Sequence, residues 1–193
     1  MICNKKLFYC LFIFLCFTIL FAKPVKADLM GSTLSWQYYA HAGSYSQSGG
    51  ITNGSFTVNG GIGGTFIGNT GPYYFNIIAD GSSITFDYSI ATAATWAASS
   101  LSLGPTIYNG IAIDMVSGPA FTSVTIDSAT NMVGFDTSSF SFTSSQIQVD
   151  WANLSFGPDT IVKLDINTVP EPTAMLLLGL ALMGFVGVRR MLQ

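Results

Sequence analysis

Short stretches in which apolar and polar residues alternate recur through the middle of the chain, and they constrain its fold more than any other feature. The clearest cover 84–90, 111–115, 147–151 and 162–166. Successive side chains of a β-strand point to opposite faces, so a period of two predicts strands that each bury one face. No long stretch has the 3.6-residue period of an amphipathic helix. The sequence between 28 and 168 therefore predicts an all-β domain.

Dipeptides that favour tight turns lie between the alternating stretches, because their residues tolerate a positive φ. They are Asn53-Gly54, Asn59-Gly60, Asp80-Gly81 and Asn109-Gly110. About ten strands at this spacing predict an antiparallel β-sandwich of the jelly-roll or Ig-like type, with a barrel-like closure as the alternative. The Gly-, Ser- and Asn-rich stretch 43–71 predicts long loops or a loose edge hairpin.

The first 27 residues have the layout of a secretory signal peptide. Lys5 and Lys6 precede a largely apolar run over 7–22, and Ala27 supplies a small residue for cleavage. The run is short for a membrane span and suits a signal helix. We therefore expect signal peptidase to cut after Ala27, with an uncleaved anchor as the alternative.

A second apolar run covers 174–188, contains no polar side chain and is followed by Arg189 and Arg190. As a helix it would be about 22 Å long, at about 1.5 Å per residue. A hydrocarbon core is about 30 Å thick, so a transmembrane helix here needs local thinning and arginines that reach the headgroups. Basic residues favour the cytoplasmic side. Both ends of the chain would then lie on the cytoplasmic side of the inner membrane before processing. The body would be anchored to that membrane and would face the periplasm.

Pro170, Glu171 and Pro172 stand just before this run, and the two prolines hold the backbone extended. The tripeptide, the apolar run and Arg189-Arg190 together resemble the PEP-CTERM sorting signal of bacteria that make exopolysaccharide. The resemblance implies that residues 169–193 are a signal processed by exosortase, a membrane cysteine transpeptidase. The tripeptide would be the element that exosortase recognises, and the two arginines would be the stop signal that follows the apolar run.

The body also resembles, less specifically, a group of small PEP-CTERM cargo proteins with no assigned activity. The similar stretches are Ser35-Trp36-Gln37-Tyr38-Tyr39, Gly64-Thr65-Phe66 and Gln148-Val149-Asp150-Trp151. This second resemblance implies no site.

Charge and cysteine content exclude several functions. Residues 28–169 hold nine Asp, no Glu and one base, Lys163, which gives a charge of about −8 at neutral pH. Such a body has no electrostatic footprint for nucleic acid, and anionic headgroups would repel it. All three cysteines lie in the predicted signal peptide, so the mature chain would have no disulfide and no thiolate chemistry.

Catalysis finds little support in the sequence. His41 is the only histidine, and no Gly-x-Ser-x-Gly motif accompanies it. A glycosidase would need two carboxylates in different environments, which nine Asp permit, but the body lacks the Arg and Glu that enzymes often use. We expect no enzyme, and a surface glycan hydrolase is the third-ranked hypothesis.

Calcium is the one cofactor that the sequence allows, with Asp127 and Asp136 as candidate ligands around the turn-like segment 128–132. No calcium-loop motif supports it, so the prediction is that the protein has no metal or other cofactor.

Aromatic residues raise the question of sugar stacking. The candidates are Trp36, Tyr38, Tyr39, Trp96 and Trp151, but the alternation around Trp36 is more typical of a core.

The leading hypothesis is an exported, non-catalytic protein of the cell surface or extracellular matrix, with exopolysaccharide or matrix protein as partner. A carbohydrate-binding adhesin, with or without calcium, is the alternative.

Overall fold

The computed structural model describes residues 28–40, 43–44, 50–68, 71, 73–98, 109–169 and 179. Its regular elements are thirteen strands, and every pairing between them is antiparallel. The prediction of an all-β fold with antiparallel sheets is confirmed for these residues. The predicted signal peptide 1–27 lies outside them, as does helix 174–188 except for Gly179. None of the helical structure within the described residues is long and apolar enough to cross a membrane.

One sheet has the order β10-β11-β8-β1-β2, and β3 also pairs with β1. Its longest strands, β1 and β8, pair along their whole length and form its centre. The strands are β1 (Thr33–Ala40), β2 (Gly43–Ser44), β3 (Asn53–Thr57), β8 (Asn109–Ser117), β10 (Phe140–Phe142) and β11 (Gln146–Asp150).

The second sheet has the order β4-β5-β6-β13-β9, so the last strand in the chain lies inside it, between β6 and β9. The strands are β4 (Ile62–Ile67), β5 (Tyr74–Ala79), β6 (Ser83–Asp87), β9 (Ala120–Ile126) and β13 (Ile161–Val169). A separate two-stranded sheet pairs β7 (Ala94–Thr95) with β12 (Ser155–Phe156).

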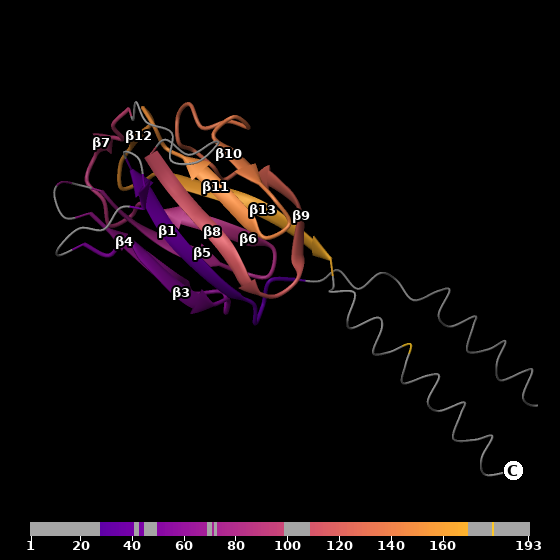
Figure 1. Cartoon of the computed structure of the whole chain (residues 1–193). Coiled ribbons are helices and arrows are strands. Elements are labelled where there is room, and N and C mark those ends of the chain that lie inside the picture. Colours follow the sequence, from indigo (N-terminus) through magenta and orange to yellow (C-terminus); the bar gives the residue numbers. More distant parts are fainter. Residues whose placement is uncertain are drawn as a thin grey trace, which may run out of the picture.

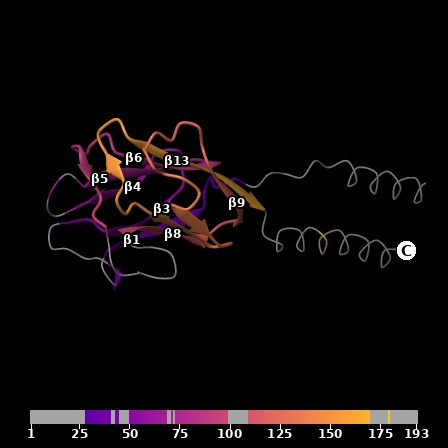
Figure 2. The same cartoon turned by 90° about the horizontal axis from the view of Figure 1, so that it is seen from above.

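The two large sheets face each other across one apolar core (Figures 1 and 2). Tyr38 on β1 meets Phe66 on β4 with ring centroids 4.6 Å apart. Trp151, which directly follows β11, packs edge-on against Phe86 on β6 at 5.1 Å. Offset and edge-to-face contacts of this kind are the favourable arrangements for aromatic rings. The period-two stretches therefore supply the side chains that hold the sheets together.

Two of the four predicted turn dipeptides are wrong. Asn53-Gly54 and Asn109-Gly110 begin strands β3 and β8 instead of ending them. A Cβ at Gly54 would lie 2.8 Å from Nε1 of Trp36, and one at Gly110 would lie 1.7 Å from the carbonyl oxygen of Val149. These glycines allow close approach within the sheet.

The other two dipeptides, Asn59-Gly60 and Asp80-Gly81, do lie between strands, and Gly60 has a φ of 82°. The stretch 43–71 contains more structure than predicted. It holds β3 and β4, which follow each other in the chain but belong to opposite sheets.

Candidate functional site

The last strand carries the chain directly into the predicted sorting segment. Along β13 the side chains alternate between half-buried and buried, and Val162, Leu164 and Ile166 lie in the core. Pairing with β9 continues to the end of the strand, where Thr168 is opposite Phe121 and Val169 is opposite Ala120. The sheet therefore extends to the residue immediately before Pro170.

The residues predicted to be processed lie outside the described part of the chain. They are Ala27, Pro170, Glu171, Pro172, Arg189 and Arg190. His41, the only histidine, also lies outside it. What the structure defines is the domain end to which the sorting segment is attached.

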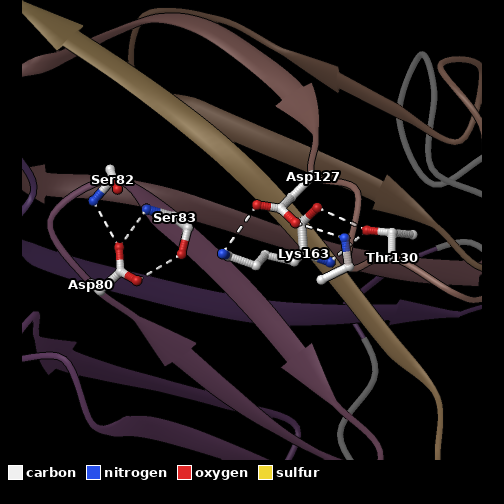
Figure 3. Close-up of polar contacts among 7 residues, drawn as sticks. Asp80, Ser82, Ser83, Asp127, Thr130 and Lys163 are labelled. Atoms are coloured by element: carbon white, nitrogen blue, oxygen red, sulfur yellow. Dashed lines mark hydrogen bonds and ion pairs between the residues drawn. The ribbon is translucent and has the colours of Figure 1, made fainter.

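Lys163, the single base of the body, lies at the centre of a group of acids on the outer face of the second sheet (Figure 3). Its Nζ is 3.1 Å from a carboxylate oxygen of Asp127, which directly follows β9. The hydrogen bond from Lys163 to Asp127, together with the nearby charges of Asp165 and Asp80, raises the pKa of the Lys163 ammonium above its ordinary value despite opposing desolvation. Lys163 therefore links the end of β9 to β13.

The pKa of Asp127 is below its ordinary value, first because the backbone N–H of Ala129 donates to the carboxylate and second because Lys163 does. At Asp80, partial burial acts to raise the carboxyl pKa. Hydrogen bonds from Ser82 and Ser83 outweigh it, and the pKa falls. Both carboxylates thus stay ionised and serve as caps of their own turns.

Asp136, the other calcium candidate, caps a turn as well. Its Oδ1 accepts hydrogen bonds from the backbone N–H of Ser138 at 2.8 Å and from the Ser138 hydroxyl at 2.6 Å, which lower the pKa of Asp136. Within the described ranges, no group of three or more His, Cys, Asp or Glu side chains could hold a metal ion. Asp127 and Asp136 each have a structural role, and the expectation that the protein has no metal or other cofactor stays a prediction.

Four of the aromatic side chains considered for sugar stacking are buried. Trp36 is 3 % exposed, Tyr38 5 %, Trp96 2 % and Trp151 0 %. The interpretation of this alternation as core is confirmed for Trp36 and Tyr38, and the stacking platform that these four would have formed is not available on the surface.

Two of the three buried indoles in the aromatic core differ in hydrogen bonding. Trp96 Nε1 donates to the hydroxyl oxygen of Tyr88 at 3.2 Å, and burial raises the pKa of Tyr88 well above its ordinary value. Trp151 Nε1 is buried and has no hydrogen-bond partner among the described residues. The Tyr38 hydroxyl donates to Asn109, whose side-chain amide donates in turn to the carbonyl of Ala97 at 2.8 Å. Sequence reasoning missed this network, because no pattern signals a contact between residues so far apart in the chain.

A small hollow lies beside β10 and β11. It has a volume of about 40 Å³ and is lined by Ser138, Ser139, Phe140, Ser141, Gln148 and Asp150. Sites for small-molecule ligands usually measure about 300–1,000 Å³. The hollow therefore has room for water and not for a sugar ring.

Comparison with known families identifies one segment. A family model described as the PEP-CTERM protein-sorting motif matches residues 168–190. The match begins at Thr168, within β13, and includes the predicted recognition tripeptide and both arginines. No curated protein and no solved structure matches the chain. The C-terminal segment is thus similar to a PEP-CTERM sorting signal, and this motif implies an exported protein that exosortase sorts and that a membrane-anchoring segment holds before processing.

Proposed function

We propose that this chain is a non-catalytic exported protein whose β-domain is released by exosortase and delivered to the cell surface or the extracellular matrix. The observation that carries the proposal is the sorting motif at 168–190, which begins at the end of the last strand. In this proposal signal peptidase removes residues 1–27, and the body faces the periplasm until the tail is cut near Pro170-Glu171-Pro172. Exopolysaccharide or another matrix protein is the proposed partner.

Several features of the described domain support a structural role. The carboxylates of Asp80, Asp127 and Asp136 accept hydrogen bonds from their own turns, and the hollow beside β10 is small. We also propose that the domain is an antiparallel β-sandwich of the jelly-roll or Ig-like type. The support is that one core cluster draws its side chains from both large sheets.

A carbohydrate-binding adhesin is the second candidate, and the outer face of the first sheet favours it. There Gln37, Ala112 and Gln148 are cross-strand neighbours, and Gln146 donates to Asp114 at 2.7 Å. Amide and carboxylate groups on a flat sheet can hydrogen-bond to sugar hydroxyls. A surface glycan hydrolase remains the third-ranked possibility, with no residue assigned to it.

The sorting step is tested by fractionation and mass spectrometry of the mature termini. We expect the secreted or surface form to lack the tail, and a Pro170→Ala, Glu171→Ala, Pro172→Ala variant to stay in the membrane fraction. The matched control is Pro158→Ala with Asp159→Ala, which changes an exposed Pro-acid pair in the turn before β13. If residues 173–193 remain on all of the secreted protein, the sorting proposal is wrong.

The absence of catalysis and the nature of the partner need separate measurements on the released protein. A glycan array with wild type and Gln148→Ala tests the adhesin, because sugar binding through the outer face of the first sheet would be lost in the variant. Release of reducing ends from a bound polysaccharide would contradict the non-catalytic assignment.

A further inference from the structure

Three strand ends and the start of the domain meet at one end of the molecule, which we call the exit end. Val169, the last residue of β13, pairs with Ala120, the first residue of β9. Two residues, Gly118 and Pro119, join the end of β8 to that start of β9. Figure 1 shows the end of β13 beside β9 at this extremity. The exit end is therefore where the domain connects to the sorting segment.

The domain begins at the same end. Thr33, the first residue of β1, pairs with Ser117, the last residue of β8. The N–H of Leu29 donates to the carbonyl of Gly81, and the N–H of Ile166 donates to the carbonyl of the adjacent Ser82. The turn between β5 and β6 thus ties the first residues of the domain to its last strand.

Large apolar side chains are exposed at this end. Among the described residues eight such side chains are exposed, and five of them lie at the exit end, whereas Ile51, Ile90 and Val133 do not. The five are Met30 (49 % exposed), Ile62 (61 %), Val116 (61 %), Phe142 (39 %) and Val169 (48 %).

The pairing and hydrogen bonds place each of the five. Val116 is the second-last residue of β8, and Val169 and Phe142 are the last residues of β13 and β10. The hairpin after β10 is held to β9 because the N–H of Phe121 donates to the carbonyl of Ser144. Ile62 begins β4, just after the turn in which Gly60 donates to the carbonyl of Ala79. Met30 directly precedes Gly31, whose N–H donates to the carbonyl of Val58 after β3.

Most of the acids lie away from the exit end. Asp87 and Asp150 end their strands at the opposite extremity, Asp127 follows the far end of β9, and Asp159 precedes β13. Asp28 and Asp80 lie close to the exit end, and Asp114 and Asp165 lie three and four residues before the ends of β8 and β13. The exit end therefore has fewer carboxylates than the opposite end, and it meets less repulsion from anionic lipid headgroups.

The chain length between the domain and the apolar tail limits their separation. Only residues 170–173 lie between Val169 and the start of the apolar run at Ala174. An extended chain spans at most about 3.6 Å per residue, so these two residues are within about 18 Å of each other. While the tail is in the bilayer, the exit end is held at the membrane surface.

We propose that the exit end is a membrane-contacting surface, with Met30, Ile62, Val116, Phe142 and Val169 entering the headgroup region of the lipid bilayer until the tail is cut. The proposal rests on the proposed function, since it requires the tail to be inserted. Apolar side chains of a surface-bound element enter about 5–10 Å into this region. The contact fixes the orientation of the domain and brings the segment at 170–172 to the level of the headgroups, where a membrane enzyme reaches it.

The test uses the full chain in phosphatidylcholine vesicles with or without brominated acyl chains, which quench nearby tryptophan. Val116→Trp places a reporter at the exit end, and Val133→Trp, at a still more exposed valine (85 % against 61 %) at the opposite end, is the control. The three native tryptophans are buried in the core and give the same background in both variants. We expect brominated lipid to reduce the added fluorescence of Val116→Trp about twofold and that of Val133→Trp negligibly.

Equal quenching of the two reporters, or none at Val116→Trp, would overturn the proposal. Fluorescence that changes with protein density and not with bromination would assign the surface to a second copy of the chain. Vesicle flotation, measured on the same samples, tests the membrane-anchored precursor separately from the docking surface. A chain that does not float contradicts the membrane-anchored precursor, whereas a chain that floats without quenching contradicts only the docking surface. Val116→Asp with Phe142→Asp, in the Met30→Trp background, should abolish quenching at Met30→Trp while flotation is kept.

Discussion

Two of the three buried indoles allow a matched test of how the aromatic core is stabilised. Trp96 and Trp151 are both buried and both packed among aromatic rings, but only Trp96 has a hydrogen-bond partner for its Nε1. Substitution of either by Phe removes part of the ring and leaves a cavity of about 40 Å³. At about 24 cal/mol per Å³ this costs about 1 kcal/mol in each case.

The polar contribution has opposite signs at the two positions. In Trp151→Phe the buried, unpaired N–H disappears, and relief of that desolvation penalty is worth about 1–3 kcal/mol. In Trp96→Phe the hydrogen bond to the Tyr88 hydroxyl is lost, which costs about 0.5–1.5 kcal/mol. We therefore expect Trp151→Phe to be close to neutral and Trp96→Phe to be less stable than it by about 2–4 kcal/mol.

The assay is equilibrium unfolding of the released domain in urea, with the midpoint converted through a common m-value, and thermal unfolding as a second measurement. A difference of about 3 kcal/mol corresponds to roughly 6–12 °C in Tm for a domain of this size. If Trp151→Phe is as destabilising as Trp96→Phe, the unpaired indole N–H costs nothing, and the reasoning from hydrogen-bond satisfaction is refuted.

Four further predictions concern the two members of the ion pair, a close contact and the domain end. The carboxyl pKa of Asp127 is lowered in the folded state, so its contribution to stability is present above about pH 4 and is lost as pH falls through the folded pKa. Unfolding measured at a series of pH values should show that acid lowers the free energy of unfolding less in Asp127→Asn than in wild type. An equal loss of stability in both would contradict this prediction. The pKa of Lys163 is raised, so its contribution persists below about pH 10.5 and disappears above the folded pKa; the alkaline limb of the same profile should flatten in Lys163→Met. Gly110→Ala would place a Cβ 1.7 Å from a backbone carbonyl oxygen of β11, so expression and circular dichroism should show loss of the folded state, and native-like stability would contradict the register. Insertion of four Gly/Ser residues between Val169 and Pro170 frees the sorting segment from the sheet, so pulse-chase should show faster processing, and an unchanged rate would show that the strand end is no obstacle.

The period-two pattern predicted the central strands well, because burial of one face acts on every second residue. The stretches 111–115, 147–151 and 162–166 correspond to β8, β11 and β13. The stretch 84–90 is wrong at its end, since Ile90 is 48 % exposed. There the carboxylate of Asp87 accepts a hydrogen bond from the N–H of Ser89 and starts a turn, and this local capping overrides the alternation.

Turn dipeptides were less reliable for a physical reason. A glycine after an asparagine signals either a positive φ or the close approach of another group, and the sequence does not distinguish these causes. Gly60 has the first, whereas Gly54 faces the Trp36 indole and Gly110 faces the Val149 carbonyl. Which cause applies depends on strand pairing between distant residues.

The candidate sites also differ in whether they depend on neighbouring residues or on residues far apart in the chain. The sorting motif at 168–190 could be found from the sequence, because a contiguous segment contains all of its residues. The partner of Lys163 could not, since Asp127 comes beside it only through the pairing of β9 with β13. The sequence shows a single base in an acidic body but does not indicate which acid pairs with it.

The position of β13 has a consequence for when the domain can form. As the last strand to be synthesised, it fills the place between β6 and β9, with core residues Val162, Leu164 and Ile166. Until it arrives, β6 and β9 present unpaired edges and the core lacks one wall. A chain interrupted before Ile161 would thus have neither a closed sheet nor the motif that begins at Thr168. Completion of the fold and display of the sorting address depend on the same final residues, so incomplete products are left both unstable and undeliverable.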